Sequence, residues 1–453
     1  MPSVDIAHAN SVRLHNEMNR GVENEPPIDV WRPANARPEC AQSPYENSSS
    51  MTDLSDLTAA ASPLSLEDVR ALLPWVAERE ALPDQNTASV SATMRRLKDA
   101  RLGALRLPRE IGGAGLSLVE LFAFVIDLAA ADSNVAHAFR NHLNTTESLL
   151  IDRSRVPAFE AFLARTAAGK TFGTSVTELG RQNVGNFDYQ TAVTPGPNGL
   201  RLNGTKFYST GNLYADYLYI YAVDDAGKPV KVVLPATREG VDVVDDWDGF
   251  GQPFTGSGTT NYTDVPVKPD ELIDDRAATR LPYVATFPQL YLSAVVAGIL
   301  QRVVADAAQL VKSRDRNFYH AVDEVPANDP LLLSVIGRLD SVAHLARVGV
   351  LEAAQWLERA YDSATAGTPA VHAFEQAAAS TARTKVVIDE LALRAAGEMF
   401  EVGGASATRR GKRLDRHWRA LRTVTAHNPL VYKALAIGRQ VTHDTPLPNL
   451  SYF

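Results

Sequence analysis

The spacing of apolar residues divides the chain into stretches of two kinds. Between about residues 64 and 168 apolar side chains recur every three or four positions, as at Leu66, Val69 and Leu73. This spacing puts them on one face of a helix. Ser117 with Glu120 three positions later forms a capping box that predicts the start of a further helix. The glycine-rich stretch REIGGAGLS (109–117) predicts a turn before it.

The pattern changes at Gly169. Apolar, β-branched and aromatic residues alternate with polar ones in short runs between Gly, Pro and Asn turns, from 170 to 275. Such runs are typical of strands. No stretch long enough for a helical crossover separates them, so we expect an antiparallel sheet.

Helical periodicity returns after about residue 283. Several segments exceed the usual length of a globular helix and predict a four-helix bundle: 283–320, 330–363, 371–402 and 414–439. The sequence therefore predicts an α+β fold that is mainly α. We expect a helical domain at 61–169, a β domain at 170–282 and a helical bundle at 283–453.

Residues 1–60 differ from the remainder. They are rich in Asn, Pro, Ser and Glu, with scattered apolar residues, so we expect a disordered extension. Met51 offers a second possible start of translation after most of this extension.

Composition excludes several classes of function. A net charge of −8 and a pI near 5.7 argue against nucleic-acid or anionic-membrane binding. Cys40 is the only cysteine, so no intrachain disulfide can form and a reducing compartment is indicated. The apolar run at 290–300 is too short to span a bilayer. We expect a cytoplasmic protein.

Short motifs add little chemistry. GFGQPFTG (249–256) has two glycines of a dinucleotide fingerprint but a proline where the helix should begin, so we interpret it as a turn. There is no HExxH pair and no metal-like spacing of Cys and His, so we expect no metal.

Longer motifs carry a family resemblance. They are SVTELG (175–180), RLNGTKFYSTGNLYADYLYIYAV (201–223) and GSGTTNYTDVPVKPDEL (256–272), with PREIGGAGLS at 108–117. Together they resemble the acyl-CoA dehydrogenase superfamily, whose fold binds flavin between the β domain and the C-terminal bundle. The resemblance implies that Thr210 bonds the isoalloxazine edge near N5 and that Tyr208 lies beside the ring. Ordinary strand packing is the alternative for both residues.

A dehydrogenase of this family needs a carboxylate to remove the substrate's α-proton. In the common branch we align this glutamate several residues after a Gly-Gly turn, and here that position holds Arg410, which cannot act as a base. A base relocated to the first helices of the bundle remains possible, although no carboxylate stands out between 283 and 300.

A second branch resembles the chain more closely. LDRHWRALRTVTAHNPLVYK (414–433), VAHAFRNHLN (135–144) and the DDW at 245–247 are similar to reduced-flavin-dependent monooxygenases built on this fold, typified by dibenzothiophene monooxygenase. This resemblance implies reduced FMN (or FAD) delivered by a separate NAD(P)H:flavin reductase. Dioxygen would react with the reduced flavin to give a C4a-(hydro)peroxyflavin. This adduct would oxygenate a sulfur, a nitrogen or an aromatic carbon of a small substrate. It also implies a homotetramer.

Two histidines match catalytic positions of those relatives. His427 in TAHNP would stabilise the peroxide or move its proton, since histidine suits proton transfer near neutral pH. It could instead cap a helix before Pro429. His137 would be a second pocket histidine, with a satisfied core histidine as the alternative.

The resemblance assigns further contacts with less detail. The flavin contacts would be Thr174, Ser175, Tyr208, Thr210, Trp247, Arg314, Arg316 and Ser406. Arg314 or Arg316 would bind the flavin phosphate, and Ser406 would lie near the flavin of a neighbouring subunit. Asn141 and His142 would line the substrate pocket.

Arginines follow the Gly403–Gly404 pair. Arg409, Arg413 and Arg416 are spaced as one helical stripe, which predicts a solvated face or ion pairs between subunits. Two rival functions remain: an acyl-CoA dehydrogenase with a relocated base, and a non-catalytic binding subunit with a flavoprotein fold.

Overall fold

The computed structural model describes residues 63–180, 188–273, 278, 280–450 and 453. All of them belong to one compact unit, Thr52–Phe453. The predicted disordered extension at 1–60, with Cys40, lies outside the described residues. The order of helices, strands and helices confirms the predicted fold class. The three predicted domain boundaries stay predictions.

Helices fill the chain before the sheet. They are α2 Leu66–Arg70, α3 Leu73–Ala81, α4 Thr87–Asp99, α5 Leu118–Ala131, α6 Ser133–Ala138, α7 Arg140–Ile151 and α8 Ala158–Ala167. The capping box predicted at Ser117 is present, since its hydroxyl accepts from Glu120 N–H and the Glu120 carboxylate accepts from Ser117 N–H. Asp132 ends α5 and caps the start of α6, the helix that carries His137.

Strands form one sheet in the order β6-β7-β3-β2-β4-β5-β8, with β1 paired to β4. Their bounds are β1 Phe172–Ser175, β2 Ala192–Gly196, β3 Gly199–Lys206, β4 Tyr217–Val223, β5 Pro229–Pro235, β6 Val241–Val243, β7 Thr260–Val267 and β8 Leu272–Ile273. The prediction of an antiparallel sheet is wrong for two pairs, because β1 and β2 both run parallel to β4. The β2–β3 hairpin lies in the connection between the parallel strands β1 and β4, where we had expected that only a helix could serve.

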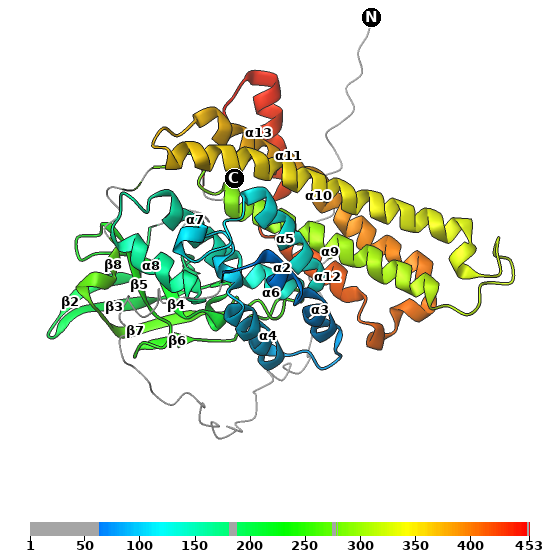
Figure 1. Ribbon diagram of the computed structural model, residues 1–453, viewed down its shortest axis with the longest axis horizontal. Helices are drawn as coiled ribbons and strands as arrows, with labels where there is room; N and C mark the ends of the chain where they lie inside the picture. The colour runs from blue at the N-terminus through cyan, green and yellow to red at the C-terminus, as the bar shows by residue number, and fades with distance from the viewer. Residues whose placement is uncertain (1–62, 181–187, 274–277, 279, 451–452) are drawn as a thin grey trace, which may run out of the picture. The chain divides into compact units, whose positions relative to one another are not determined.

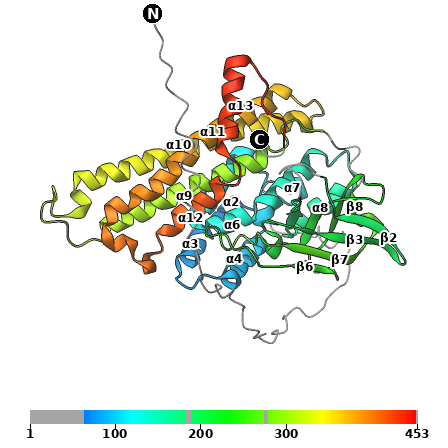
Figure 2. The ribbon, with the colours of Figure 1, turned by 180° about the vertical axis from the view of Figure 1, so that it is seen from behind.

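Long helices follow the sheet: α9 Thr286–Lys312, α10 Pro330–Thr365 and α11 Val371–Gly403. Figures 1 and 2 show them side by side, with α5 against α9. Gly298 permits this approach, since a Cβ there would lie 2.4 Å from the carbonyl oxygen of Ile126 on α5. By length and composition α9 resembles a membrane-spanning helix, but 61% of its most apolar window is buried in the protein, as in a core helix.

The fourth predicted helix is two helices, α12 Asp415–Thr425 and α13 Leu430–His443. Pro429 precedes α13, lacks an N–H and disfavours helical geometry at Asn428. The break places His427 in the turn between the helices. Short 3-10 turns complete the fold: η1 Leu102–Ala104, η2 Arg109–Ile111, η3 Asn212–Tyr214, η4 Pro269–Glu271, η5 Pro326–Asn328, η6 Ala405–Thr408 and η7 Arg410–Lys412.

The predicted arginine stripe is wrong as a continuous helical face. Arg409 lies before η7, and Arg413 has a left-handed backbone with φ of 50°. Arg413 donates to the backbone carbonyl oxygens of Glu80 and Leu82. The chain before α12 is therefore tied to α3 of the same chain, where we had expected solvent or another subunit.

Candidate active site

Two histidines from distant parts of the chain come together through Arg140. His137 lies on α6, and His427 lies in the turn after α12. Arg140, the first residue of α7, places Nη1 3.5 Å from Nε2 of His427. A guanidinium can only donate, so Nε2 of His427 accepts and its proton resides on Nδ1.

His137 is buried, with 6% of its surface exposed. Its Nδ1 lies 3.0 Å from Oε1 of Gln252, while its Nε2 is buried without a hydrogen-bond partner among the described residues. Burial, reinforced by the charge of Arg140, lowers the pKa of His137 to about 3. His137 is therefore neutral at physiological pH.

His427 is reached by solvent, yet protein atoms lie closely around it. This crowding, then the charge of Arg140 and the nearby His137, holds the pKa of His427 well below its ordinary value. Asn428 beside it is buried and donates to Oε1 of Gln289 on α9, which fixes the turn. Both histidines thus act as neutral hydrogen-bonding groups, and the positive charge between them belongs to Arg140.

The turn at 208–210 is hydrogen-bonded to α7 close to Arg140. Tyr208 has a left-handed backbone, with φ of 55°, and 56% of its surface is exposed. Its ring meets Trp247 edge-on at 6.2 Å. Thr210 Oγ1 lies 2.9 Å from Oγ of Ser257, and Asn141 Nδ2 donates to the Thr210 carbonyl oxygen at 2.7 Å. Asn141 thereby joins this turn to α7, next to Arg140.

These features fit a planar aromatic cofactor. An exposed tyrosine beside a tryptophan offers an apolar surface, and His137 offers a buried nitrogen lone pair that the described residues leave unpaired. Arg140 has the strongest charge effect on both histidines, and at His427 it is followed by His137 and then Lys385. Among the described residues no cluster of His, Cys, Asp and Glu could hold a metal ion.

Three of the predicted contacts bond to other groups of the protein. His142 is buried, accepts from Phe172 N–H at Nδ1 and lies 3.2 Å from the Gly103 carbonyl oxygen at Nε2. Both ring nitrogens are engaged within the protein, and its place in the substrate pocket stays a prediction. Ser175 is fully buried, and its hydroxyl accepts from Asn212 and Tyr262. Thr174 bonds Thr145 instead, and successive strand residues point to opposite faces, so Thr174 and Ser175 cannot both face flavin.

The predicted phosphate-binding residues lie at the other end of α9. Arg314 Nη1 donates to the Val402 carbonyl oxygen at 2.8 Å, and Ser406 bonds the next carbonyl oxygen, that of Gly403. Arg316 is exposed nearby in the sequence. Gln289 and Arg314 are separated by about 37 Å of mainly helical chain at 1.5 Å per residue. One flavin cannot contact both groups in the same chain.

Arg410 also lies away from the histidines. It is exposed in η7, before α12, whereas His427 follows α12. The 11 residues of that helix separate them by about 16 Å. Arg410 therefore does not lie beside His427 in the same chain, and our comparison of its position with that of a catalytic base stays a prediction. Arg140, and not a carboxylate, has the strongest charge effect on His137 and His427.

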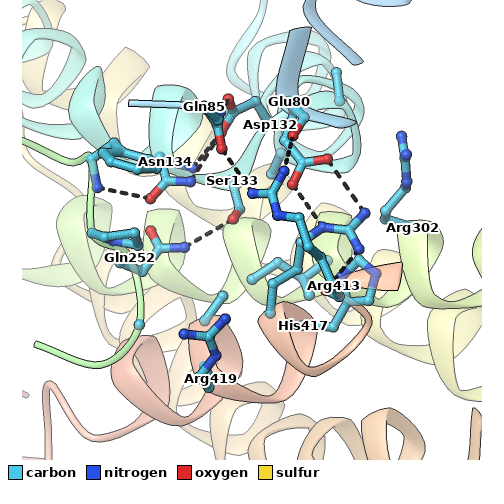
Figure 3. A pocket seen from close by; sticks show the side chains of 18 of the residues that line it. Glu80, Gln85, Asp132, Ser133, Asn134, Gln252, Arg302, Arg413, His417 and Arg419 are labelled. Carbon is cyan, nitrogen blue, oxygen red and sulfur yellow. Dashed lines mark hydrogen bonds and ion pairs between the residues drawn. The ribbon is translucent and has the colours of Figure 1, made fainter. Parts of the chain in front are cut away.

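A small pocket of about 70 Å³ has Gln252 in its lining (Figure 3). It is lined by the α3–α4 connection, the α5–α6 junction, residues 250–254 and α12. Arg416 in its wall is paired with Glu80 and Asp306. The pocket therefore has paired charges in part of its wall, and Gln252 links it to His137.

Sequence reasoning missed Arg140 and Gln252. Arg140 stands inside the quoted stretch VAHAFRNHLN, and its spacing of three from His137 was the available signal. Gln252 stands in the motif that we dismissed as a turn. It is a turn, with a left-handed φ of 55° at Gln252, but its side chain reaches His137.

The C-terminal helices match a known family. The family model "Acyl-CoA dehydrogenase, C-terminal domain" matches residues 290–431. Over these residues the chain is similar to the acyl-CoA dehydrogenase superfamily. This match includes α10, α11, α12 and the turn that carries His427.

Individual relatives belong to the monooxygenase branch. The chain is 29% identical to dibenzothiophene monooxygenase of Mycolicibacterium goodii, covering 81% of this chain and 92% of that protein. It is 29% identical to the probable FMNH2-dependent monooxygenase SfnC of Pseudomonas putida, covering 85% and 96%.

Solved structures agree. Methanesulfinate monooxygenase MsuC from Pseudomonas fluorescens superposes with a TM-score of 0.75 at 26% identity, covering 87% of this chain and all of that one. FMN-bound TdsC from Paenibacillus sp. A11-2 superposes with a TM-score of 0.73 at 25% identity, covering 85% and 99%.

Proposed function

We propose that this protein is the oxygenase component of a two-component flavin-dependent monooxygenase. The observation that carries the proposal is the arrangement of His137, Arg140 and His427, in which Arg140 has the strongest charge effect on both histidines. The matched relatives include monooxygenases, one of them named as FMNH2-dependent. The cofactor is reduced FMN, with O₂ as co-substrate.

Bound reduced flavin would supply the electrons with which one atom of O₂ enters the substrate and the other becomes water. Tyr208 and Trp247 would hold the ring system, with the Thr210 turn at its edge. His427 would donate its Nδ1 hydrogen, because Arg140 occupies Nε2. Arg140 would keep positive charge close to where oxygen is reduced.

The second residue group suits a neighbouring subunit. Arg314, Arg316 and Ser406 are too far along α9 to share a flavin with His427 of the same chain, so we propose that they contact flavin across subunits. Exposed apolar side chains on α10 and α13 would support a homotetramer: Leu331, Leu345, Val348, Val431, Tyr432 and Val441. A separate NAD(P)H:flavin reductase in the cytoplasm would deliver the reduced flavin.

The substrate class that we favour is a small organosulfur compound oxygenated at sulfur. Dibenzothiophene monooxygenase and methanesulfinate monooxygenase, two of the matched proteins, carry sulfur compounds in their names. Oxygenation of nitrogen or aromatic carbon is the alternative chemistry.

The direct test supplies the protein with FMN, NADH, a flavin reductase and ¹⁸O₂, together with dibenzothiophene, a dialkyl sulfide or methanesulfinate. We expect a product that carries one ¹⁸O atom, formed only when this chain is present. A matched reaction with reductase alone controls for peroxide chemistry in solution.

The rival functions predict different results. In an acyl-CoA dehydrogenase, the bound flavin would be reduced by an acyl-CoA in the absence of oxygen. The first acidic residue of α9 is Asp306, and it is paired with Arg302, Arg416 and His417, which disfavours a relocated base there. A binding subunit would show no affinity for FMN in either redox state. Either result would contradict the proposed function.

A further inference from the structure

Gln252 is an unusual residue in an ordinary-looking loop. It is 2% exposed and has a left-handed backbone with φ of 55°, a conformation that costs a non-glycine residue free energy. Its neighbour Gly251 would meet the Arg419 carbonyl oxygen at 2.1 Å if it carried a Cβ. The loop is thus pressed against α12, and contacts of the Gln252 side chain help to hold its conformation.

Both ends of the Gln252 amide are engaged. Oε1 lies 3.0 Å from Nδ1 of His137, and Nε2 donates to Oγ of Ser133 at 2.9 Å (Figure 3 shows the second contact). Ser133 and His137 are one helical turn apart on α6. Because the NH₂ group donates to Ser133, the carbonyl oxygen of the amide faces the histidine.

The surrounding loop is anchored by bonds that do not involve the histidine. Asn134 Oδ1 accepts from the backbone N–H of Phe254 at 3.2 Å, and Thr255 Oγ1 donates to the Gln252 carbonyl oxygen at 3.1 Å. These two bonds position the loop. The contact with His137 is made by the side-chain amide of Gln252. The two roles can therefore be separated by substitution.

We propose that Gln252 is a positioning residue that fixes His137 as the Nδ1–H tautomer and thereby presents an unprotonated Nε2 to the bound ligand. A carbonyl oxygen can only accept, so Nδ1 must carry the hydrogen. Nε2, buried and without a described partner, is then an obligate acceptor. The ligand group opposite it must be an N–H or O–H donor. The effect of this tautomer on catalysis rests on the proposed function. The tautomer itself does not depend on that function.

The first test needs no flavin. Solid-state NMR of flavin-free protein with ¹⁵N-labelled histidine distinguishes protonated from unprotonated ring nitrogens, and a His137→Phe variant identifies the His137 signals. We expect hydrogen on Nδ1 and none on Nε2. Gln252→Met keeps the side-chain length but removes the acceptor. It should lower the ratio of the Nδ1–H to the Nε2–H tautomer of His137 about fivefold, which is the effect of one lost hydrogen bond. Gln252→Glu keeps an acceptor and should keep hydrogen on Nδ1, but its negative charge also raises the pKa of His137.

The second test measures how much reduced flavin ends as hydrogen peroxide with the full chain, reductase and substrate. Gln252→Met should raise the peroxide fraction about fivefold, while the loop control Asn134→Ala should stay near wild type. Hydrogen on Nε2 of His137 in the wild type would overturn the inference, as would equal leakage in Gln252→Met and Asn134→Ala. If the wild type fails to oxygenate any substrate while the tautomer is as expected, the proposed function is at fault and the positioning role stands.

Discussion

Arg416 on α12 and Glu80 on α3 form a two-point ion pair, with Nε to Oε1 at 2.7 Å and Nη2 to Oε2 at 3.3 Å. The same guanidinium reaches Asp306 on α9 at 3.0 Å. One side chain therefore joins three helices from distant parts of the sequence. Both partners are largely buried, so each depends on the other for its charge balance.

Removing Arg416 should destabilise the protein. Arg416→Met leaves Glu80 without its ion-pair partner in a mostly buried position, and we expect the free energy of unfolding to fall by about 3 kcal/mol. Urea unfolding followed by circular dichroism measures it. Arg419→Met is the matched control, because Arg419 pairs with the exposed Asp415 and should contribute less than about 1 kcal/mol. Equal losses in both variants would contradict this assignment.

The charge of Arg140 can be tested through its effect on His427. In Arg140→Met the positive charge beside Nε2 is gone, so the pKa of His427 should rise toward its ordinary value although crowding still opposes protonation. An NMR titration of labelled histidine measures this pKa. We expect the variant to protonate His427 at a higher pH than the wild type. An unchanged titration would show that crowding alone sets the pKa.

Stability should decrease with acidity because of His142. Burial lowers the pKa of His142 to about 4, so between pH 4 and about 6.5 the unfolded chain binds more protons than the folded one. Its contribution is complete above pH 6.5 and is lost as the pH falls, by up to about 3 kcal/mol near pH 4. Urea unfolding at several pH values in wild type and His142→Gln checks this. The variant should be less stable at pH 7 but show a shallower decline.

Some of this architecture was predictable because it is local. The helices of the bundle follow from apolar periodicity, and the capping box at Ser117 follows from two residues three positions apart. The motifs TELG and NGTKF were recognisable, and the structure shows why they occur together: Lys206 Nζ lies 2.7 Å from Glu178 Oε1. No local pattern could show that pairing, since 28 positions separate the two residues.

The candidate site was harder to predict because its contacts are long-range. The Arg140–His427 contact spans 287 positions, and Gln252 reaches His137 across 115. Periodicity carries no information on such contacts. His142 shows the converse, since it stands in the same quoted stretch as His137 but both its ring nitrogens bond to backbone groups. Only the packing around each histidine distinguishes His137, the candidate site residue, from His142, the structural one.

Tyr208 combines strain with exposure, and the two can be separated. A tyrosine at a φ of 55° is strained, whereas glycine adopts this conformation freely. Tyr208→Gly should therefore leave stability unchanged or raise it by up to about 1 kcal/mol, and at the same time lose the ring that we propose contacts flavin. We expect FMN affinity, measured by fluorescence quenching, to fall about tenfold, consistent with the loss of one aromatic contact of 1 to 2 kcal/mol. Tyr208→Phe keeps the ring and should bind FMN like the wild type. If Tyr208→Gly bound FMN equally well, the exposed ring would have no part in holding the cofactor, and the strain at this turn would need another explanation.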